Sequence, residues 1–205
     1  MDKDMQSALK EWLRGPHNDV LSKSPVHPDI IEAIYSLFEE WKGNKELVNS
    51  LCLRLFGYYR SEGVESKVFV LQFVPSLVYS YLSAIAQGDR KDVGSIQTLL
   101  LALYNLEAGG EAQSPKVHSF RVPNIAQPSV YHDTSALAAS SLTETVKRLD
   151  PGNRISVKIG PHPHLHSFNA ENRLPALAAL LRVYSHYLSM YSRSSLTETC
   201  MAFRR

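Results

Sequence analysis

Three histidines alternate with other residues in the segment Gly160-Pro161-His162-Pro163-His164-Leu165-His166, and this spacing suggests chemistry. In an extended backbone, alternate side chains share one face, so His162, His164 and His166 could converge on a metal ion. A metal site needs further ligands, and neither cysteine nor carboxylate follows before Glu171. The two prolines favour the alternative of a rigid surface loop that presents its imidazoles to a partner or to solvent.

A second candidate is Tyr131-His132-Asp133, in which the aspartate could orient a histidine general base. Catalysis of that kind also needs a nucleophile in a special turn, and the chain has no Gly-x-Ser-x-Gly sequence. A helix cap after a proline-rich loop explains these residues better. Glycine-rich phosphate-binding motifs are also missing from the sequence. We therefore expect a protein that is not an enzyme and that uses no cofactor or catalytic metal.

The composition fits a single globular domain. The chain has 205 residues, of which 44% are hydrophobic and 20% are charged. A formal charge of +2 argues against nucleic-acid binding, which needs a concentrated basic surface. Cys52 lies in an apolar helical pattern and Cys200 near the end of the chain, and we expect both to stay reduced in the cytosol, although a disulfide between them is an alternative.

Apolar residues at helical spacing predict most of the chain to be α-helical. Proline and glycine residues mark many of the boundaries, such as Gly15-Pro16 after the first helix and Pro28 at the start of the second. The segments expected to be helices are 2–13, 28–42, 45–59, 64–86, 96–106, 135–149 and 169–191, followed by a last helix from Ser195.

The fourth segment, 64–86, is apolar on nearly all sides, which predicts a central helix contacted all round. Pro75 should kink it by removing one backbone hydrogen bond. Its most apolar part, Val68–Leu82, is shorter than the roughly 20 residues that a membrane span needs.

Two short segments alternate in polarity and predict strands, namely 117–122 and 155–159. We expect them to pair as a small antiparallel ribbon attached to the helical body. Asp150-Pro151-Gly152-Asn153 before the second strand is a strong turn signal, and Asp133 or Thr134 should cap the intervening helix. The expected fold class is all-α with one β-ribbon, and the segments 109–133 and 150–168 should be irregular apart from these elements.

The C-terminal part should again be helical. In the helix over 169–191, Pro175 marks either a kink or the true first turn, and six residues should form the buried face: Leu174, Leu177, Ala178, Leu181, Tyr184 and Leu188. Ser195-Leu196-Thr197-Glu198 reads as a capping box that opens a further helix, with Leu196, Cys200 and Phe203 on its apolar face. Because this apolar helix ends after about two turns, we expect residues 1–205 to form one domain that is incomplete at its C-terminus.

Several short sequence motifs after about residue 50 resemble those of the hyccin family, and they occur in the family's order and with similar spacing. They include Leu71–Leu77 (LQFVPSL), Leu99–Glu107 (LLLALYNLE) and Val117–Pro123 (VHSFRVP). The remaining phrases are Tyr59-Arg60-Ser61, Pro128–His132 (PSVYH), Gly160–Pro163 (GPHP) and Asn172-Arg173-Leu174.

This resemblance implies a non-catalytic role. Hyccin-family proteins bind a tetratricopeptide-repeat scaffold and, with it, support the type III alpha phosphatidylinositol 4-kinase at the plasma membrane. The implied location is the cytosol and the plasma membrane, reached through partners. Because specific contacts often lie on irregular segments, the candidate partner-binding residues are Phe120, Val122, Ile125, Tyr131, His132, Pro161 and His162.

Two other classes of function remain as alternatives. One is a module that binds a membrane surface directly, and the other is a metal-dependent enzyme built on His162, His164 and His166. The small basic end formed by Arg193, Arg204 and Arg205 has fewer than the roughly four to eight charges that attach a protein firmly to a membrane.

Overall fold

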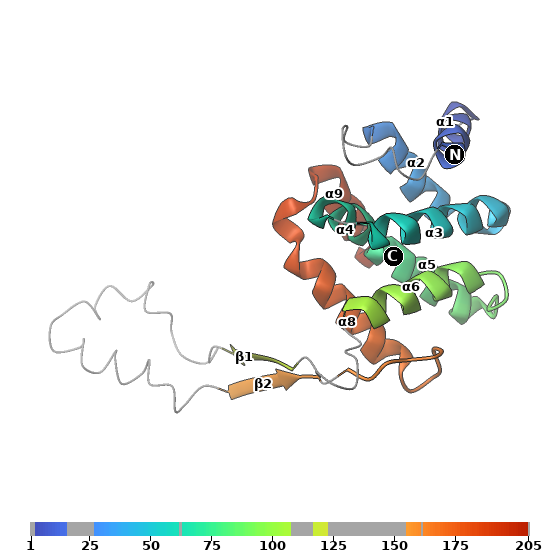
Figure 1. The fold of residues 1–205 in the computed structure, drawn as a ribbon. Helices are drawn as coiled ribbons and strands as arrows, with labels where there is room; N and C mark the ends of the chain where they lie inside the picture. The colour runs from blue at the N-terminus through green and yellow to red at the C-terminus, as the bar shows by residue number, and fades with distance from the viewer. Residues whose placement is uncertain are drawn as a thin grey trace, which may run out of the picture.

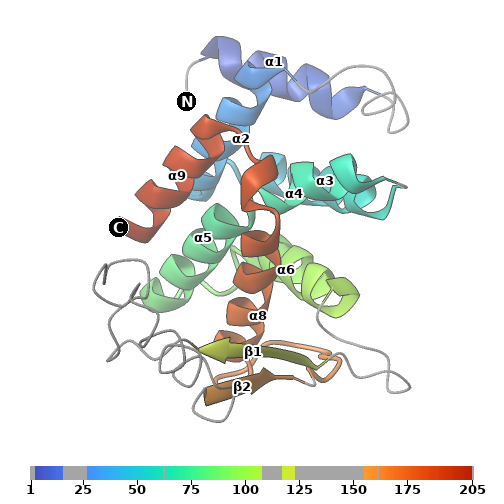
Figure 2. The ribbon, with the colours of Figure 1, turned by 90° about the vertical axis from the view of Figure 1, so that its left-hand side faces the viewer.

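The computed structural model describes residues 3–15, 27–61, 63–107, 117–122, 155–160 and 162–204. Within these residues the protein is mainly helical, with one pair of short strands. Figures 1 and 2 show the helices as one body, with helix α1 at one end and the two strands at the other. The helix expected at 135–149 and the turn expected at 150–153 lie outside the described residues.

The helices in chain order are α1 (Lys3–Arg14), α2 (Pro28–Glu39), α3 (Lys45–Arg60), α4 (Val64–Leu71), α5 (Val74–Gln87), α6 (Gly94–Glu107), α8 (Arg173–His186) and α9 (Arg193–Arg204), with short 3-10 turns η1 (Trp41–Gly43) and η4 (Leu188–Met190). The strands are β1 (His118–Val122) and β2 (Ile155–Ile159).

Helix α1 packs on α2 and α3. Leu9 is fully buried, and the Trp12 ring stacks on Tyr58 with ring centroids 5.7 Å apart. The buried Arg54 donates from Nη1 to the carbonyl oxygens of Leu13 and Gly15, at 3.1 and 2.7 Å. These carbonyls end helix α1, where a cation is favoured by the helix dipole.

The long apolar segment contains two helices, so the prediction of one helix kinked at Pro75 was wrong. Helix α4 ends at Leu71, the chain turns at Gln72 and Phe73, and α5 begins at Val74. Pro75 therefore lies in the first turn of α5, where its missing N–H costs little. Residues Val64–Gln87 together are long and apolar enough to cross a membrane, unlike the shorter run considered from the sequence, but 72% of the most apolar window is buried inside the protein.

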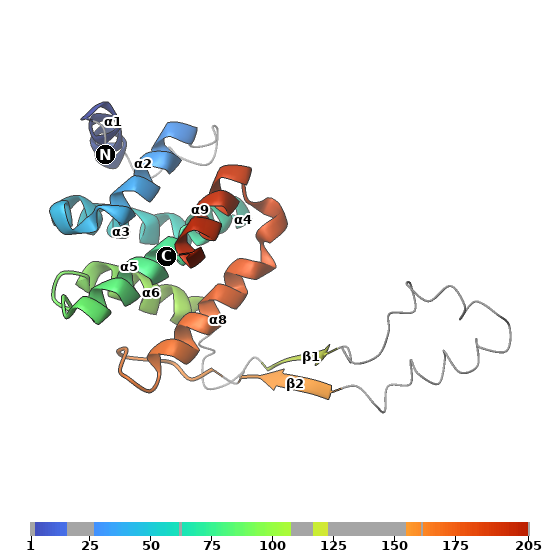
Figure 3. The same ribbon diagram turned by 180° about the vertical axis from the view of Figure 1, so that it is seen from behind.

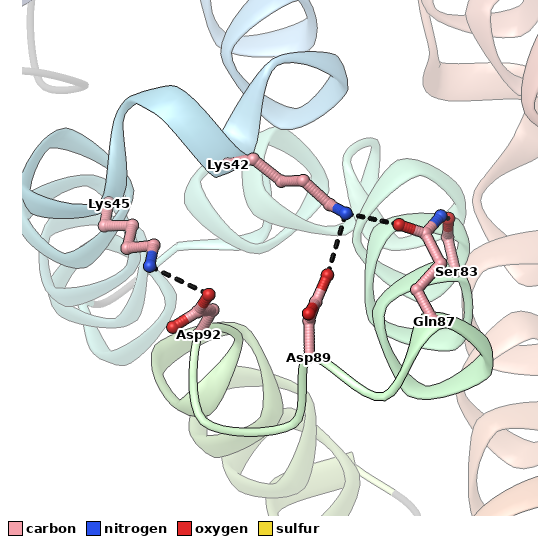
Figure 4. A network of polar contacts seen from close by, with 6 residues as sticks. All are labelled: Lys42, Lys45, Ser83, Gln87, Asp89 and Asp92. Carbon is pink, nitrogen blue, oxygen red and sulfur yellow. Dashed lines mark hydrogen bonds and ion pairs between the residues drawn. The ribbon is translucent and has the colours of Figure 1, made fainter.

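Helix α6 packs on α3, α5 and α8. Ion pairs connect the loop before it to η1 and to the start of α3. Lys42 Nζ lies 2.7 Å from Asp89 and also bonds to Gln87, while Lys45 Nζ lies 2.8 Å from Asp92 (Figure 4). The lysines are about half exposed, and such pairs contribute about 0.2–1 kcal/mol each. Burial of the helices therefore matters more than these charges.

The strands β1 and β2 run antiparallel, with Phe120 opposite Val157 and His118 opposite Ile159. Figures 1 and 3 show the pair extending away from the helical body beside the beginning of α8. We call these two strands the ribbon.

Helix α8 buries a face that only partly matches the expected one, with Leu181 partly buried against the core. Leu177 and Tyr184 are buried as predicted, but Leu174 is 62% exposed and Leu188 is 43% exposed. Ala178 is exposed as well. The helix spans only Arg173–His186, which places Pro175 in its first turn. Its buried residues are Ala176, Leu177, Ala179, Leu180 and Tyr184.

Helix α9 is the largest departure from the sequence pattern. It begins at Arg193, and the Ser195 amide donates to Ser192 Oγ at 3.2 Å, so Ser195 is inside the helix and does not cap it. Of the expected apolar face, Leu196 is partly buried against the core, but Cys200 is exposed and Phe203 is 66% exposed. The buried residues are instead Ser195 and Thr199.

One hydrophobic core joins all the helices from α1 to α8. Among the described residues, seven tyrosines lie in this core, namely Tyr35, Tyr58, Tyr59, Tyr81, Tyr104, Tyr184 and Tyr191. Cys52 is buried in the same core, and both Cys52 and Cys200 are free thiols.

Candidate partner-binding surface

The histidine-rich segment passes from β2 to α8 across the end of α6. Residues 163–165 have no regular secondary structure, and their backbone is held by side chains of α6. Tyr104 Oη donates to the Pro163 carbonyl at 2.9 Å. Asn105 both accepts from the Leu165 amide and donates to the Leu165 carbonyl, at 2.9 and 2.8 Å. The Asn105 side chain thus pairs with both the N–H and the C=O of Leu165, as the backbone of a neighbouring strand would.

His162 is half-buried between two helices. Its ring meets Tyr104 of α6 edge to face, with centroids 6.2 Å apart. Its Nε2 lies 3.0 Å from Nη2 of Arg182 on α8. Burial raises the pKa of Tyr104, so its hydroxyl stays a neutral donor at ordinary pH.

The three histidines do not share one face. His164 and His166 are exposed, with ring centroids 5.4 Å apart, whereas His162 Nε2 meets the Arg182 guanidinium. In the part of the chain that the structure describes, no three His, Cys, Asp or Glu side chains are grouped as metal ligands. This geometry does not favour the metal-site alternative.

The segment ends in a polar turn that starts α8. Asn169 Oδ1 accepts from the amides of Glu171 and Asn172, at 2.9 and 2.8 Å. Asn172 Oδ1 accepts from the Asn169 amide at 2.8 Å, and its Nδ2 donates to the Ser167 carbonyl at 3.0 Å. The phrase Asn172-Arg173-Leu174 is therefore part of a helix-start structure.

Of the other predicted partner-binding residues, the structure describes only two. Phe120 and Val122 lie on β1, where their backbones pair with Val157 and Ile155. Ile125, Tyr131, His132 and Pro161 fall outside the described residues. Their role in partner binding stays a prediction.

The sequence reasoning missed a second exposed surface, around α9. Met201 and Phe203 on α9, with Leu188 and Met190 before it, are 39–66% exposed. We call these four residues the α9 apolar surface. No local signal reveals it, because Phe203 has the same four-residue spacing as the buried Ser195 and Thr199 and yet is exposed.

Hydrogen bonds explain why α9 buries hydroxyl groups. Ser195 Oγ donates to Gln72 Oε1 at 2.6 Å, and Gln72 Nε2 donates to the Phe69 carbonyl at 2.9 Å. Thr199 Oγ1 bonds to Tyr184 Oη at 2.8 Å. Gln72 is buried in the turn between α4 and α5, so this turn supplies the groups that α9 needs.

A groove of about 380 Å³ separates α2 from α9. Ile31 and Tyr35 give it an apolar wall, and Glu32 and Glu198 contribute carboxylates. Burial raises the pKa of Tyr35, and the Tyr35 hydroxyl donates to the Gln72 carbonyl at 3.1 Å.

Comparison with known proteins gives the same family as the motifs found in the sequence. Residues 19–205 match the Hyccin family, which is more than nine-tenths of the chain and includes every helix from α2 to α9. The match takes in β1, β2 and the histidine-rich segment, and it begins after α1. The chain is therefore a member of the Hyccin family.

Proposed function

We propose that this protein is a non-catalytic subunit that helps to assemble a phosphatidylinositol 4-kinase complex and to localise it at the plasma membrane. The observation that carries this proposal is the Hyccin match over residues 19–205. Hyccin membership implies a role in such a complex. The proposed direct partner is a tetratricopeptide-repeat scaffold, and through it the kinase.

Two features of the surface support a docking role. The ribbon extends from the body, and it carries the predicted contact residues Phe120 and Val122. The α9 apolar surface exposes large side chains, and exposed apolar groups often mark protein interfaces. Figure 2 shows α9 and the ribbon toward opposite ends of α8. Membrane association would then be peripheral and indirect, from a cytosolic pool.

Co-expression with a tetratricopeptide-repeat scaffold, followed by affinity purification, tests the proposal. We expect the two proteins to co-purify and the kinase to follow when it is also present. Failure to recover a stable complex with the purified scaffold by size-exclusion chromatography contradicts the proposal. Flotation with anionic liposomes in the absence of partners distinguishes direct membrane binding, which we expect to be weak.

Surface variants locate the interface. The pair Phe120→Ser and Val122→Ser tests the ribbon, and the pair Met201→Ser and Phe203→Ser tests the α9 apolar surface. Leu53→Ser is the matched control, because Leu53 is 73% exposed on α3, away from both surfaces. We expect at least one of the two pairs to weaken scaffold binding about tenfold or more, as loss of a central apolar contact does. Equal binding by both pairs and the control would place the interface elsewhere.

A further inference from the structure

The contact between His162 and Arg182 fixes the protonation state of the histidine. A guanidinium group has only N–H donors, so Arg182 Nη2 must donate across the 3.0 Å to His162 Nε2. An imidazole nitrogen accepts only when it carries no proton. His162 is therefore neutral in this fold, with its proton on Nδ1.

His162 also occupies a position from which it can affect the ribbon. It lies three residues after Ile159, the last residue of β2, and precedes the backbone groups that Tyr104 and Asn105 hold. The bond to Arg182 and the ring contact with Tyr104 thus connect this part of the chain to α8 and α6 close to the end of β2. Ile159 pairs with His118, so movement at the end of β2 reaches β1 as well.

We propose that the His162–Arg182 contact is an acid-sensitive fastening of the ribbon to α8. Protonation of His162 removes the acceptor and places an imidazolium against a guanidinium, so the bond is lost and the two cations repel each other. The contact contributes stability above the pH at which an unperturbed histidine titrates, about 6.5, and that contribution is lost as the pH falls below it.

Titratable and charged groups lie on each element that the described residues place near this contact. From α6, Tyr104 faces the ring as a neutral phenol, and Glu107 at the helix end is paired with Lys67 at 2.9 Å. From α8, Arg182 faces it directly, and His186 lies one turn further along that helix. Lys158 on β2 and His164 on the same segment are exposed to solvent.

This inference does not depend on the proposed partner, and its test uses the full chain alone. Nitrogen chemical shifts of the histidine rings, followed by NMR from pH 8 to pH 5, report tautomer and protonation for each residue. We expect His162 to carry its proton on Nδ1 at pH 7.5. Detection of the Nε2–H tautomer, or of a protonated ring, at pH 7.5 would overturn the proposal whatever any variant does.

Hydrogen exchange of the β1 and β2 amides measures the consequence. After correction for the intrinsic pH dependence, we expect exchange in the ribbon to become about tenfold faster at pH 5.5 than at pH 7.5, as for loss of one charge-assisted hydrogen bond. Amides of α3 serve as an internal reference and should not change. Ribbon exchange that follows the α3 reference at both pH values contradicts the proposal.

Three variants assign the effect to this pair. His162→Gln keeps an acceptor that does not titrate, so the pH dependence of ribbon exchange should disappear. Arg182→Met removes the donor, so exchange should be fast at both pH values. His164→Gln, which changes an exposed histidine two residues away, should behave as the unmodified protein does. A pH response that survives in His162→Gln assigns the effect to another group and overturns the proposal.

Discussion

The first and last helices that the structure describes, α1 and α9, have the same length and dock in opposite ways. Each spans 12 residues. Helix α1 buries Leu9 completely and stacks Trp12 on Tyr58, whereas α9 buries Ser195 and Thr199 and leaves Met201 and Phe203 exposed. Amphipathic pattern alone therefore does not say which face of a terminal helix meets the core. The surface against which the helix packs determines which face is buried. For α9 that surface includes the polar turn at Gln72, which accepts a hydrogen bond from Ser195.

The largest effect is expected at α1. Replacing the fully buried Leu9 by alanine leaves a cavity, and we expect a loss of about 3 kcal/mol in the free energy of unfolding of the unit that includes α1. Urea denaturation followed by the fluorescence of Trp12 and Trp41 measures it. Lys10→Ala, at an exposed position on the same helix, is the control and should change stability by less than about 0.5 kcal/mol. Similar losses in both variants would contradict apolar docking of α1.

A smaller but definite effect is expected at the polar contact of α9. Ser195→Ala leaves Gln72 Oε1 without its 2.6 Å donor in a buried site, which should cost about 1–3 kcal/mol. Ser194→Ala changes the exposed neighbour and should be nearly neutral. Chemical denaturation of the three proteins measures the difference. If Ser195→Ala and Ser194→Ala are equally stable, the buried hydroxyl does not hold α9.

Two positions on the same face of α9, four residues apart, can be compared directly. Thr199→Ala removes the bond to Tyr184 Oη and should cost about 1 kcal/mol, while Phe203→Ala removes a ring that is 66% exposed and should cost less than about 0.5 kcal/mol. An ordinary amphipathic helix would show the reverse order. A loss above about 2 kcal/mol for Phe203→Ala, measured by thermal denaturation, would mean that the Phe203 ring is packed against the body of the protein.

The two cysteines give the least perturbing test, because the protein needs no variant. Cys200 on the outer face of α9 should react with a thiol reagent in the folded state, whereas Cys52 in the core should react at least about a thousandfold more slowly, only after the structure opens. Mass spectrometry of peptides after timed labelling follows both sites. Rapid labelling of Cys52 in the folded protein would be inconsistent with the packing of α3.

The same thiol gives a pH dependence. Burial raises the pKa of Cys52 to about 12, while an unfolded cysteine ionises near 8.5. The unfolded state therefore loses a proton first, and the contribution of Cys52 to stability is fully present below about pH 8.5 and declines as the pH rises above it. Cys52→Ala should remove this part of the alkaline loss of stability.

Local chemistry in the sequence determined much of the fold. Pro28 opens α2, and apolar spacing placed α3 and α6 within a few residues of their observed bounds. Two alternating segments became β1 and β2, and the ordered phrases led to the Hyccin family. These features depend on neighbours along the chain, such as fixed proline geometry and side-chain periodicity, so a sequence displays them directly.

Only the tertiary structure decided how distant side chains meet. Gln72 and Ser195 are separated by 123 positions, yet their hydrogen bond turns α9 so that its hydroxyls are buried. From the sequence, His162 was one of three histidines that could have formed a metal site, but in the fold its Nε2 accepts a hydrogen bond from Arg182. The physical reason is the same in both cases, because a buried polar atom must find a partner and the fold determines which partner is within reach.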